Sequence, residues 1–269
     1  MVDFENREKF TVYDLRRLVK ILRSEEGCPW DREQTHESIR RSFLEEAYEV
    51  AEAIDERNPA HLREELGDVL LQVIFHAQIE DEQSVFDLDD VADAEVRKML
   101  FRHPHVFGDE TAATSGEVLE NWDKLKRVEK GQATVTDSLR AVATSLPGLW
   151  RAEKLKKKAA KVGFDFADVH AALGKLREEL GELEQAINAG DGGNAEKELG
   201  DVLFSAANVA SFLEVDPEDA LSGTCERFIE RFELMERAAT ESGRALADLT
   251  PEEQDKLYRK AKAEIEAGK

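Results

Sequence analysis

Apolar residues recur along this chain at the three- and four-residue intervals that are typical of amphipathic α-helices. The first clear case is residues 10–23, where one helical face carries Val12, Leu15, Leu18, Val19 and Leu22. Periodicity and start signals predict further helices over 38–56, 59–80, 89–102, 169–188 and 195–213, and others opening near 217 and 251. No alternating segment of convincing length predicts a β-strand. The pattern therefore predicts an almost entirely α-helical fold.

Helix start signals sharpen several of these boundaries. Asn58 and Pro59 supply an N-cap and a first-turn proline, and Asp216 with Pro217 repeats that signal later in the chain. Thr250 has the capping-box spacing to Glu253. These residues predict where three of the helices begin.

One stretch of the pattern occurs twice. A shift of 133 residues without a gap lays Leu66 and Gly67 on Leu199 and Gly200. The same shift lays four carboxylates on four others: Glu46, Glu49, Glu65 and Asp68 on Glu179, Glu182, Glu198 and Asp201. Each copy holds two pairs spaced three residues apart, and the second pair begins nineteen residues after the first. We interpret this as a duplicated helical unit.

The repeated carboxylates predict a metal site. Residues three apart share one face of a helix, and on the helical wheel Glu46, Asp68 and Asp201 fall between apolar positions. Like charges in a half-buried place repel and are costly to desolvate, so they require a cation or shared protons. A single pair of this kind is usually a solvated helix face, but an inward pair repeated at identical spacing favours a site. Ligands that are all oxygen favour Mg²⁺ or Mn²⁺ over zinc or a di-iron centre.

Composition narrows the classes of partner. The chain has 269 residues, 59 acidic and 37 basic, and a formal charge of −22. This balance argues against nucleic-acid or anionic-membrane binding through electrostatics. Two separated cysteines, Cys28 and Cys225, are typical of a reduced cytoplasmic protein, and neither a signal peptide nor a membrane span is predicted.

Basic residues supply candidate phosphate ligands. Two pairs spaced four apart, Lys98 with Arg102 and Arg227 with Arg231, project together from their helices. A basic helix near residue 158 adds Lys158 and Lys161. The alternatives are an ordinary basic helix end for the first pair and ion pairs with neighbouring glutamates for the basic helix.

The chain also divides by composition. Residues 131–138 are small and polar, which is typical of a linker. We predict an N-terminal domain over 1–131, a linker over 132–145 and a C-terminal domain over 146–269.

Several longer motifs carry a family resemblance. The run from Cys28 to His36 resembles a CPWDxxQTH signature, although alone it predicts only a turn with a buried Trp30. Residues 45–50 resemble EEAYEV, residues 102–107 resemble RHPHVF, and residues 155–165 are similar to KxxKAAxxGFD. Together they resemble the MazG family of nucleoside triphosphate pyrophosphohydrolases in its two-domain form.

The resemblance implies an activity and roles for the residues above. It implies Mg²⁺-dependent hydrolysis of (d)NTPs between the α and β phosphates to (d)NMP and pyrophosphate, which cleans the nucleotide pool. It also implies all-α, four-helix-bundle cores completed in a homodimer. The eight repeated carboxylates would hold the metal, the basic residues would bind the triphosphate, and Trp122 or Tyr258 would stack on the base. A metal-bound water would attack the α-phosphorus, with Glu45 or Glu178 as a candidate base.

Two departures from the family pattern affect the second half. Cys225 stands where Asn is usual, and Tyr258 stands where Trp is expected. A tyrosine still stacks on a base, whereas a cysteine lacks the amide hydrogen bond. The alternative is a nucleotide-sensing or nucleotide-binding helical protein in which one or both sites lack turnover.

Overall fold

Every element of secondary structure that the computed structural model describes is helical. It describes residues 4, 7–109, 111–112 and 114–267, apart from the side chains at 120 and 123. The predicted all-α fold is confirmed within these ranges. The chain forms two compact units, Met1–Lys126 and Arg127–Lys269, which are described separately below.

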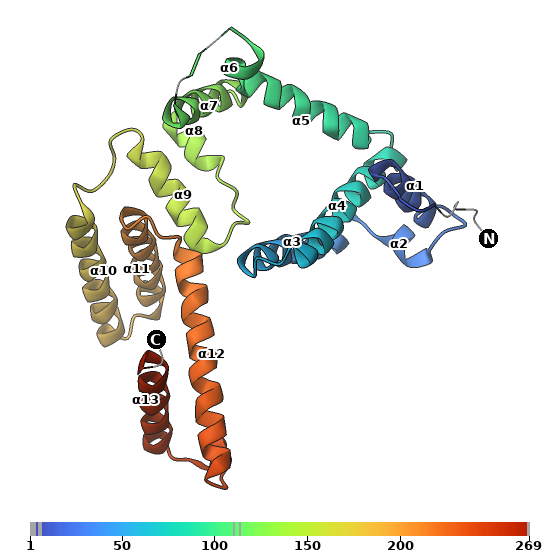
Figure 1. Ribbon diagram of the computed structural model, residues 1–269. Helices are drawn as coiled ribbons and strands as arrows, with labels where there is room; N and C mark the ends of the chain where they lie inside the picture. The colour runs from blue at the N-terminus through green and yellow to red at the C-terminus, as the bar shows by residue number, and fades with distance from the viewer. Residues whose placement is uncertain (1–3, 5–6, 110, 113, 268–269) are drawn as a thin grey trace. The chain divides into compact units, whose positions relative to one another are not determined.

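The first unit is built on a helical hairpin. Its helices are α1 (Val12–Leu22), α2 (Pro29–Glu33), α3 (His36–Asp55), α4 (Pro59–Glu82), α5 (Leu88–Arg102), α6 (Pro104–Phe107) and α7 (Ser115–Glu129), the last of which crosses the boundary between the units. Figure 1 shows α3 and α4 side by side, with α1 against α4. The core joins α1, α3 and α4 through Val19, Ile39, Ile74, Phe75 and Ile79.

Local chemistry fixes the turn of this hairpin. The Asn58 side chain accepts hydrogen bonds from the backbone N–H groups of Ala60 and His61, and Pro59 occupies the first turn. This confirms the start predicted for α4. Because only three residues separate α3 from α4, the two helices run antiparallel and bring their facing side chains into register.

A buried arginine anchors the loop that precedes α3. Arg23 donates to both Glu82 carboxylate oxygens, at 2.8 and 2.9 Å, and to the carbonyls of Asp31 and Gln34. Its guanidinium lies 5.0 Å from the centre of the Phe75 ring. Trp30 is 65% exposed, so the prediction of a buried tryptophan was wrong.

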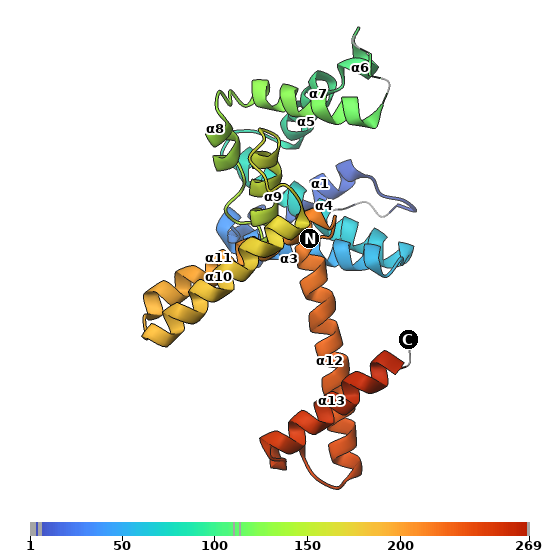
Figure 2. The same cartoon turned by 90° about the vertical axis from the view of Figure 1, so that its left-hand side faces the viewer.

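The second unit repeats the hairpin. Its helices are α8 (Val135–Arg140), α9 (Gly148–Ala160), α10 (Val169–Ala189), α11 (Gly192–Phe212), α12 (Pro217–Glu241) and α13 (Pro251–Ala267), with a 3-10 turn at Leu246–Asp248. Helices α10 and α11 lie side by side in Figures 1 and 2, and α9 packs on α11 as α1 packs on α4. Gly190 ends α10 at φ 70°, a conformation that favours glycine.

The internal repeat reaches beyond the hairpins. The 133-residue shift lays Val19 on Ala152 and Arg23 on Lys156, and all four are buried. Lys156 lies 5.0 Å from the Phe166 ring centre, as Arg23 lies over an aromatic ring in the first unit. The duplicated unit is therefore a helix packed on a hairpin, with one buried cation in each copy.

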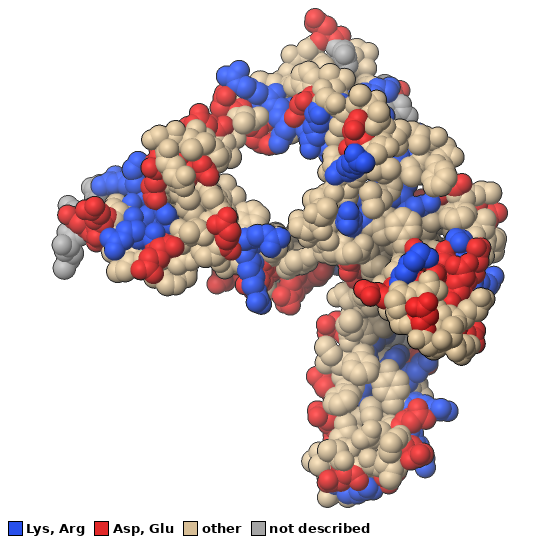
Figure 3. Space-filling model, turned by 180° about the vertical axis from the view of Figure 1, so that it is seen from behind, with Lys and Arg blue, Asp and Glu red and all other residues tan. Residues whose placement is uncertain are grey.

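The proposed linker over 132–145 contains helix α8, which packs on α9. The structure divides the chain after residue 126, and the domain limits of 1–131 and 146–269 stay predictions. On the face shown in Figure 3, acidic and basic side chains are interspersed. Among the described residues, none of the helices combines the length and apolar character needed to cross a membrane.

Candidate functional site

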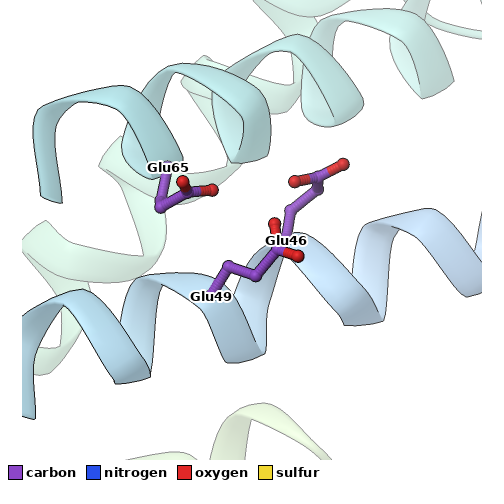
Figure 4. A group of neighbouring side chains, drawn as sticks. All are labelled: Glu46, Glu49 and Glu65. Atoms are coloured by element: carbon purple, nitrogen blue, oxygen red, sulfur yellow. The ribbon is translucent and has the colours of Figure 1, made fainter. Parts of the chain in front are cut away.

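The first hairpin gathers three carboxylates. Glu46 and Glu49 come from α3 and Glu65 comes from α4, and one oxygen of each lies within 4.8 Å of the others. Figure 4 shows the three side chains between the two helices. Glu65 is buried, Glu46 is half-buried and Glu49 is exposed. The i, i+3 spacing on α3 and the antiparallel hairpin therefore produce one cluster, which we call the first cluster.

Electrostatics in the first cluster are unfavourable without a cation. Burial raises the pKa of Glu46, and a hydrogen bond with Glu49 and the charge of Asp68 raise it further. Burial also raises the pKa of Glu65, and the neighbouring Glu49 charge adds to the effect. Asp68 lies outside the group of three but acts on both glutamates through its charge.

The second hairpin repeats the arrangement. Glu179 and Glu182 of α10 and Glu198 of α11 each offer an oxygen within 4.8 Å of the others, and we call them the second cluster. Glu179 and Glu198 are buried. Burial raises the pKa of Glu182, helped by the charges of Glu179 and Glu198. As Asp68 does in the first unit, Asp201 lies outside the group of three.

Two lysines that the sequence analysis did not single out contact the second cluster. Lys175 Nζ lies 2.8 Å from Glu178 and 2.7 Å from Glu179, and these bonds raise the lysine's pKa. Lys197 Nζ lies 2.9 Å from Glu198 Oε1 and 3.6 Å from Asp201 Oδ2. The i, i+4 spacings from Lys175 to Glu179 and from Lys197 to Asp201 were the available signal.

The donor chemistry fits a hard divalent cation. Glu198 Oε2 is buried and has no hydrogen-bond partner, although the other oxygen of the same carboxylate is paired. A buried carboxylate oxygen without a partner is costly, and a cation ligated by oxygens removes that cost. Neither group contains a cysteine or a histidine. These residues are therefore suited to hold a metal ion with a preference for oxygen ligands.

The basic pair of the first unit lies against Trp122. Arg102 is buried, and its guanidinium is 5.3 Å from the Trp122 ring centre, while His103 meets the same ring edge-on. Lys98 lies one turn away on α5 and pairs with Glu95. The structure thus brings together Arg102 and Trp122, which the sequence had offered for different parts of a nucleotide.

The second unit contains the same kind of pair. Arg231 lies 5.7 Å from the Tyr258 ring centre and donates to the tyrosine hydroxyl at 3.2 Å. Arg231 Nε is buried without a partner. Arg227, one turn earlier, donates to Thr224 Oγ1 at 2.7 Å. An arginine on an aromatic ring therefore recurs in both units, which the sequence analysis did not predict.

The remaining candidates lie outside the clusters. Lys158 donates to Ser138 at 2.8 Å, and burial together with neighbouring cations lowers its pKa. Lys161 is exposed just beyond α9. Glu45 pairs with Arg41, and Glu178 pairs with Lys175. The roles assigned to these four residues stay predictions.

Comparison with known proteins identifies the family. The MazG nucleotide pyrophosphohydrolase domain matches residues 34–107 and 164–234. The chain belongs to the MazG family. Each matched MazG range contains one complete carboxylate cluster and one basic pair, whereas Trp122 and Tyr258 lie outside both ranges. The predicted resemblance is confirmed in both halves of the chain.

Curated relatives extend the match over most of the chain. The "Nucleoside triphosphate pyrophosphohydrolase/pyrophosphatase MazG" of Thermotoga maritima is 43% identical over 249 residues, which are 93% of this chain and 94% of that protein. The "Nucleoside triphosphate pyrophosphohydrolase" of Escherichia coli K12 is 38% identical over 254 residues, 91% of this chain and 96% of that protein. A protein of the same name from Mycobacterium tuberculosis is 44% identical over 137 residues, half of this chain and 41% of its own length.

Proposed function

We propose that this protein hydrolyses nucleoside triphosphates between the α and β phosphates, releasing a nucleoside monophosphate and pyrophosphate with Mg²⁺ as cofactor. The observation that carries the proposal is the pair of glutamate clusters, each with a buried member and one within each MazG domain. The names of full-length relatives at 38% and 43% identity support the substrate class. Its role would be to clear unwanted nucleotides from the cytoplasmic pool.

Glutamates from both helices of each hairpin would hold the cation. Glu46, Glu49 and Glu65 present three oxygens in the first unit, and Asp68 adds charge beside them. Glu179, Glu182 and Glu198 do the same in the second, where the unpaired Glu198 Oε2 is available as a ligand. When bound, Mg²⁺ neutralises phosphate charge and makes a water molecule more acidic; Mn²⁺ has similar preferences.

The arginine and aromatic pairs would position the nucleotide. Arg102 and Arg231 present planar guanidinium groups suited to phosphate oxygens, with Lys98 and Arg227 one turn away on the same helices. Trp122 and Tyr258 would stack on a base with the ring face that the arginine does not cover. Phosphoryl transfer depends mainly on positioning and charge neutralisation, so these residues would supply most of the protein's contribution to catalysis.

A second candidate is nucleotide binding without turnover in one half. It is favoured by one observation: two lysines, Lys175 and Lys197, contact the second cluster, whereas the basic group described against the first cluster is a histidine, His61. A duplicated site is free to diverge, so one unit can bind a nucleotide while the other hydrolyses it.

Product analysis in ¹⁸O-labelled water tests the proposal. The protein is incubated with each NTP and dNTP plus Mg²⁺, and the masses of the separated products are measured by mass spectrometry. Attack at the α-phosphorus predicts monophosphate carrying ¹⁸O and unlabelled pyrophosphate. Release of inorganic phosphate would place the cleavage at another anhydride, and label in the pyrophosphate alone would place the attack at the β-phosphorus of the same anhydride. Binding of nucleotides with no product would favour the non-hydrolytic alternative.

A further inference from the structure

The two carboxylate clusters differ in the charge of their neighbours. The 133-residue shift that superposes the glutamates lays Glu64 on Lys197 and Ser42 on Lys175. The residue next to the buried glutamate of α4 is therefore an acid, while the residue next to the buried glutamate of α11 is a base. The ligand groups are the same in both copies, but two positive charges accompany only the second.

The contacts show how Lys197 neutralises the second cluster. Its ammonium group approaches Glu198 Oε1 at 2.9 Å and Asp201 Oδ2 at 3.6 Å, and leaves Glu198 Oε2 without a partner. In the first unit the basic group at the corresponding glutamate is His61, 3.1 Å from Glu65 and also 2.8 Å from Glu56. Lys197 thus forms ion pairs with two carboxylates of the second hairpin. His61 instead divides its contacts between Glu65 and Glu56, and Glu56 lies outside the first cluster.

Lys197 is placed to move. Its side chain is 67% exposed, and an exposed ion pair holds its partners weakly. A lysine carries a point charge on a flexible stem with three donors, so it can turn from a carboxylate to a phosphate oxygen without losing hydrogen bonds. A triphosphate arriving with its cation would offer such oxygens, and the cation would replace the lysine at the carboxylates.

We propose that Lys197 is an internal counter-cation that makes divalent-metal binding at the second cluster depend on the triphosphate, whereas the first cluster binds the ion by itself. This inference rests on the proposed function only in taking the clusters as the cation sites. The second unit would then bind a preformed metal–triphosphate complex, and Lys197 would be a specificity-determining residue there. The two halves would then differ in the order in which metal and nucleotide bind.

The test measures Mn²⁺ binding by electron paramagnetic resonance in the full-length chain. Glu49→Gln and Glu65→Gln together remove the first cluster, so that only the second is read. Three further substitutions are made in this background. Lys197→Gln removes the charge and Lys197→Arg keeps it. Lys260→Gln is the control, because it removes an exposed positive charge from α13 of the same unit. Each protein is titrated with Mn²⁺ alone and with Mn²⁺ plus an α,β-methylene triphosphate analogue, in which the proposed scissile bond cannot be cleaved.

Opposite effects of one substitution are expected in the two titrations. With Mn²⁺ alone, Lys197→Gln binds on the order of thirtyfold more tightly, the effect in water of removing one unit charge about 4 Å from a divalent ion. With the analogue present, the same variant binds the metal–analogue complex more weakly, because a phosphate contact is lost. Lys197→Arg and Lys260→Gln should match the parent in the titration with Mn²⁺ alone.

A reciprocal variant gives an independent reading. With the second cluster removed by Glu179→Gln and Glu198→Gln, Glu64→Lys should weaken Mn²⁺ binding at the first cluster by a larger factor, because it removes a negative charge as well as adding a positive one. The inference is overturned if Lys197→Gln behaves like Lys260→Gln, if it changes both titrations in the same direction, or if neither cluster binds Mn²⁺. None of these readings requires turnover, so a protein that shows the expected metal binding but forms no pyrophosphate would sink the proposed function and leave this inference standing.

Discussion

Protonation of single glutamates links the two clusters to the stability of the fold. In the folded state the pKa values of Glu46, Glu65 and Glu182 lie above the ordinary value of 4.5. The folded protein therefore binds protons more tightly than the unfolded chain, and stability is lost as the pH rises from about 4.5 through the raised values. At neutral pH the ionised glutamates of each cluster repel one another in the cation-free protein, and a divalent cation would relieve that repulsion.

We predict that Mg²⁺ raises the melting temperature more at pH 8 than at pH 5. At pH 8 the carboxylates are ionised, and a ligand present at about 100 times its dissociation constant stabilises the folded state by about 2.7 kcal/mol. At pH 5, protons compete for the same oxygens. Scanning fluorimetry at both pH values measures the difference. The same Mg²⁺ response in a Glu46→Gln, Glu179→Gln double variant would show that the ion acts elsewhere.

Arg23 ties three segments of the first unit together through buried polar contacts. Arg23→Ala should lower the free energy of unfolding by about 2–3 kcal/mol, because it leaves Glu82 and two carbonyls without their buried partner. Urea denaturation measures this change, with Arg17→Ala on the exposed side of α1 as the control. Equal losses in the two variants would mean that the buried network adds nothing. Arg23→Lys, which copies Lys156, should fall between wild type and Arg23→Ala.

Among the features of the helices, the sequence predicted those that depend on residues close together in the chain. The caps at Asn58, Asp216 and Thr250 were predicted and are present. The predicted helices on either side of each short loop are also present, and the structure pairs them as hairpins. Trp30, the arginine and aromatic pairs, and Lys197 against Glu198 depend on side-chain packing or rotamers. Apolar periodicity and caps carry no information about those contacts.

Asp216 joins two helices of the second unit. Its carboxylate caps α12 through the N–H groups of Glu218 and Asp219, and it also accepts the Trp150 indole N–H of α9 at 2.8 and 2.9 Å. We expect Asp216→Ala to cost about 2 kcal/mol, since it loses a cap and a part-buried hydrogen bond.

A double-mutant cycle separates the two contributions of Asp216. Trp150→Phe removes the indole N–H together with part of the ring, so its cost in the wild-type background should exceed its cost in Asp216→Ala by about 1 kcal/mol, since the packing loss is common to both. Urea denaturation of the four proteins gives the coupling. Additive losses would show that the cap and the indole act independently.

At the scale of the whole molecule, the duplication places matched apolar residues on both hairpins. Leu66 and Leu199 are 51% and 49% exposed, and Leu70 and Leu203 are exposed as well. Such residues repeated along a hairpin favour association with a second copy of the chain. The four-helix cores that the family resemblance implies would then each combine two hairpins.

We predict a homodimer of twice 30.3 kDa by analytical ultracentrifugation. A charge at the matched positions, in a Leu66→Glu, Leu199→Glu double variant, should shift the protein toward monomers. Leu119→Glu on α7, where the leucine is also exposed, is the matched control. A wild-type protein that sediments as a monomer at micromolar concentration would contradict the dimer.

The glutamate clusters of α3–α4 and α10–α11 are the proposed sites of metal-dependent hydrolysis. The measurement that tests this proposal most directly is pyrophosphate release from (d)NTPs with Mg²⁺ by wild type, Glu46→Gln, Glu179→Gln and the double variant. Glu37→Gln and Glu184→Gln serve as controls, since both are exposed glutamates on the same helices and lie outside the clusters. We predict that at least one cluster substitution removes most activity and that the double variant has none. Pyrophosphate release by the double variant at the wild-type rate would contradict the account.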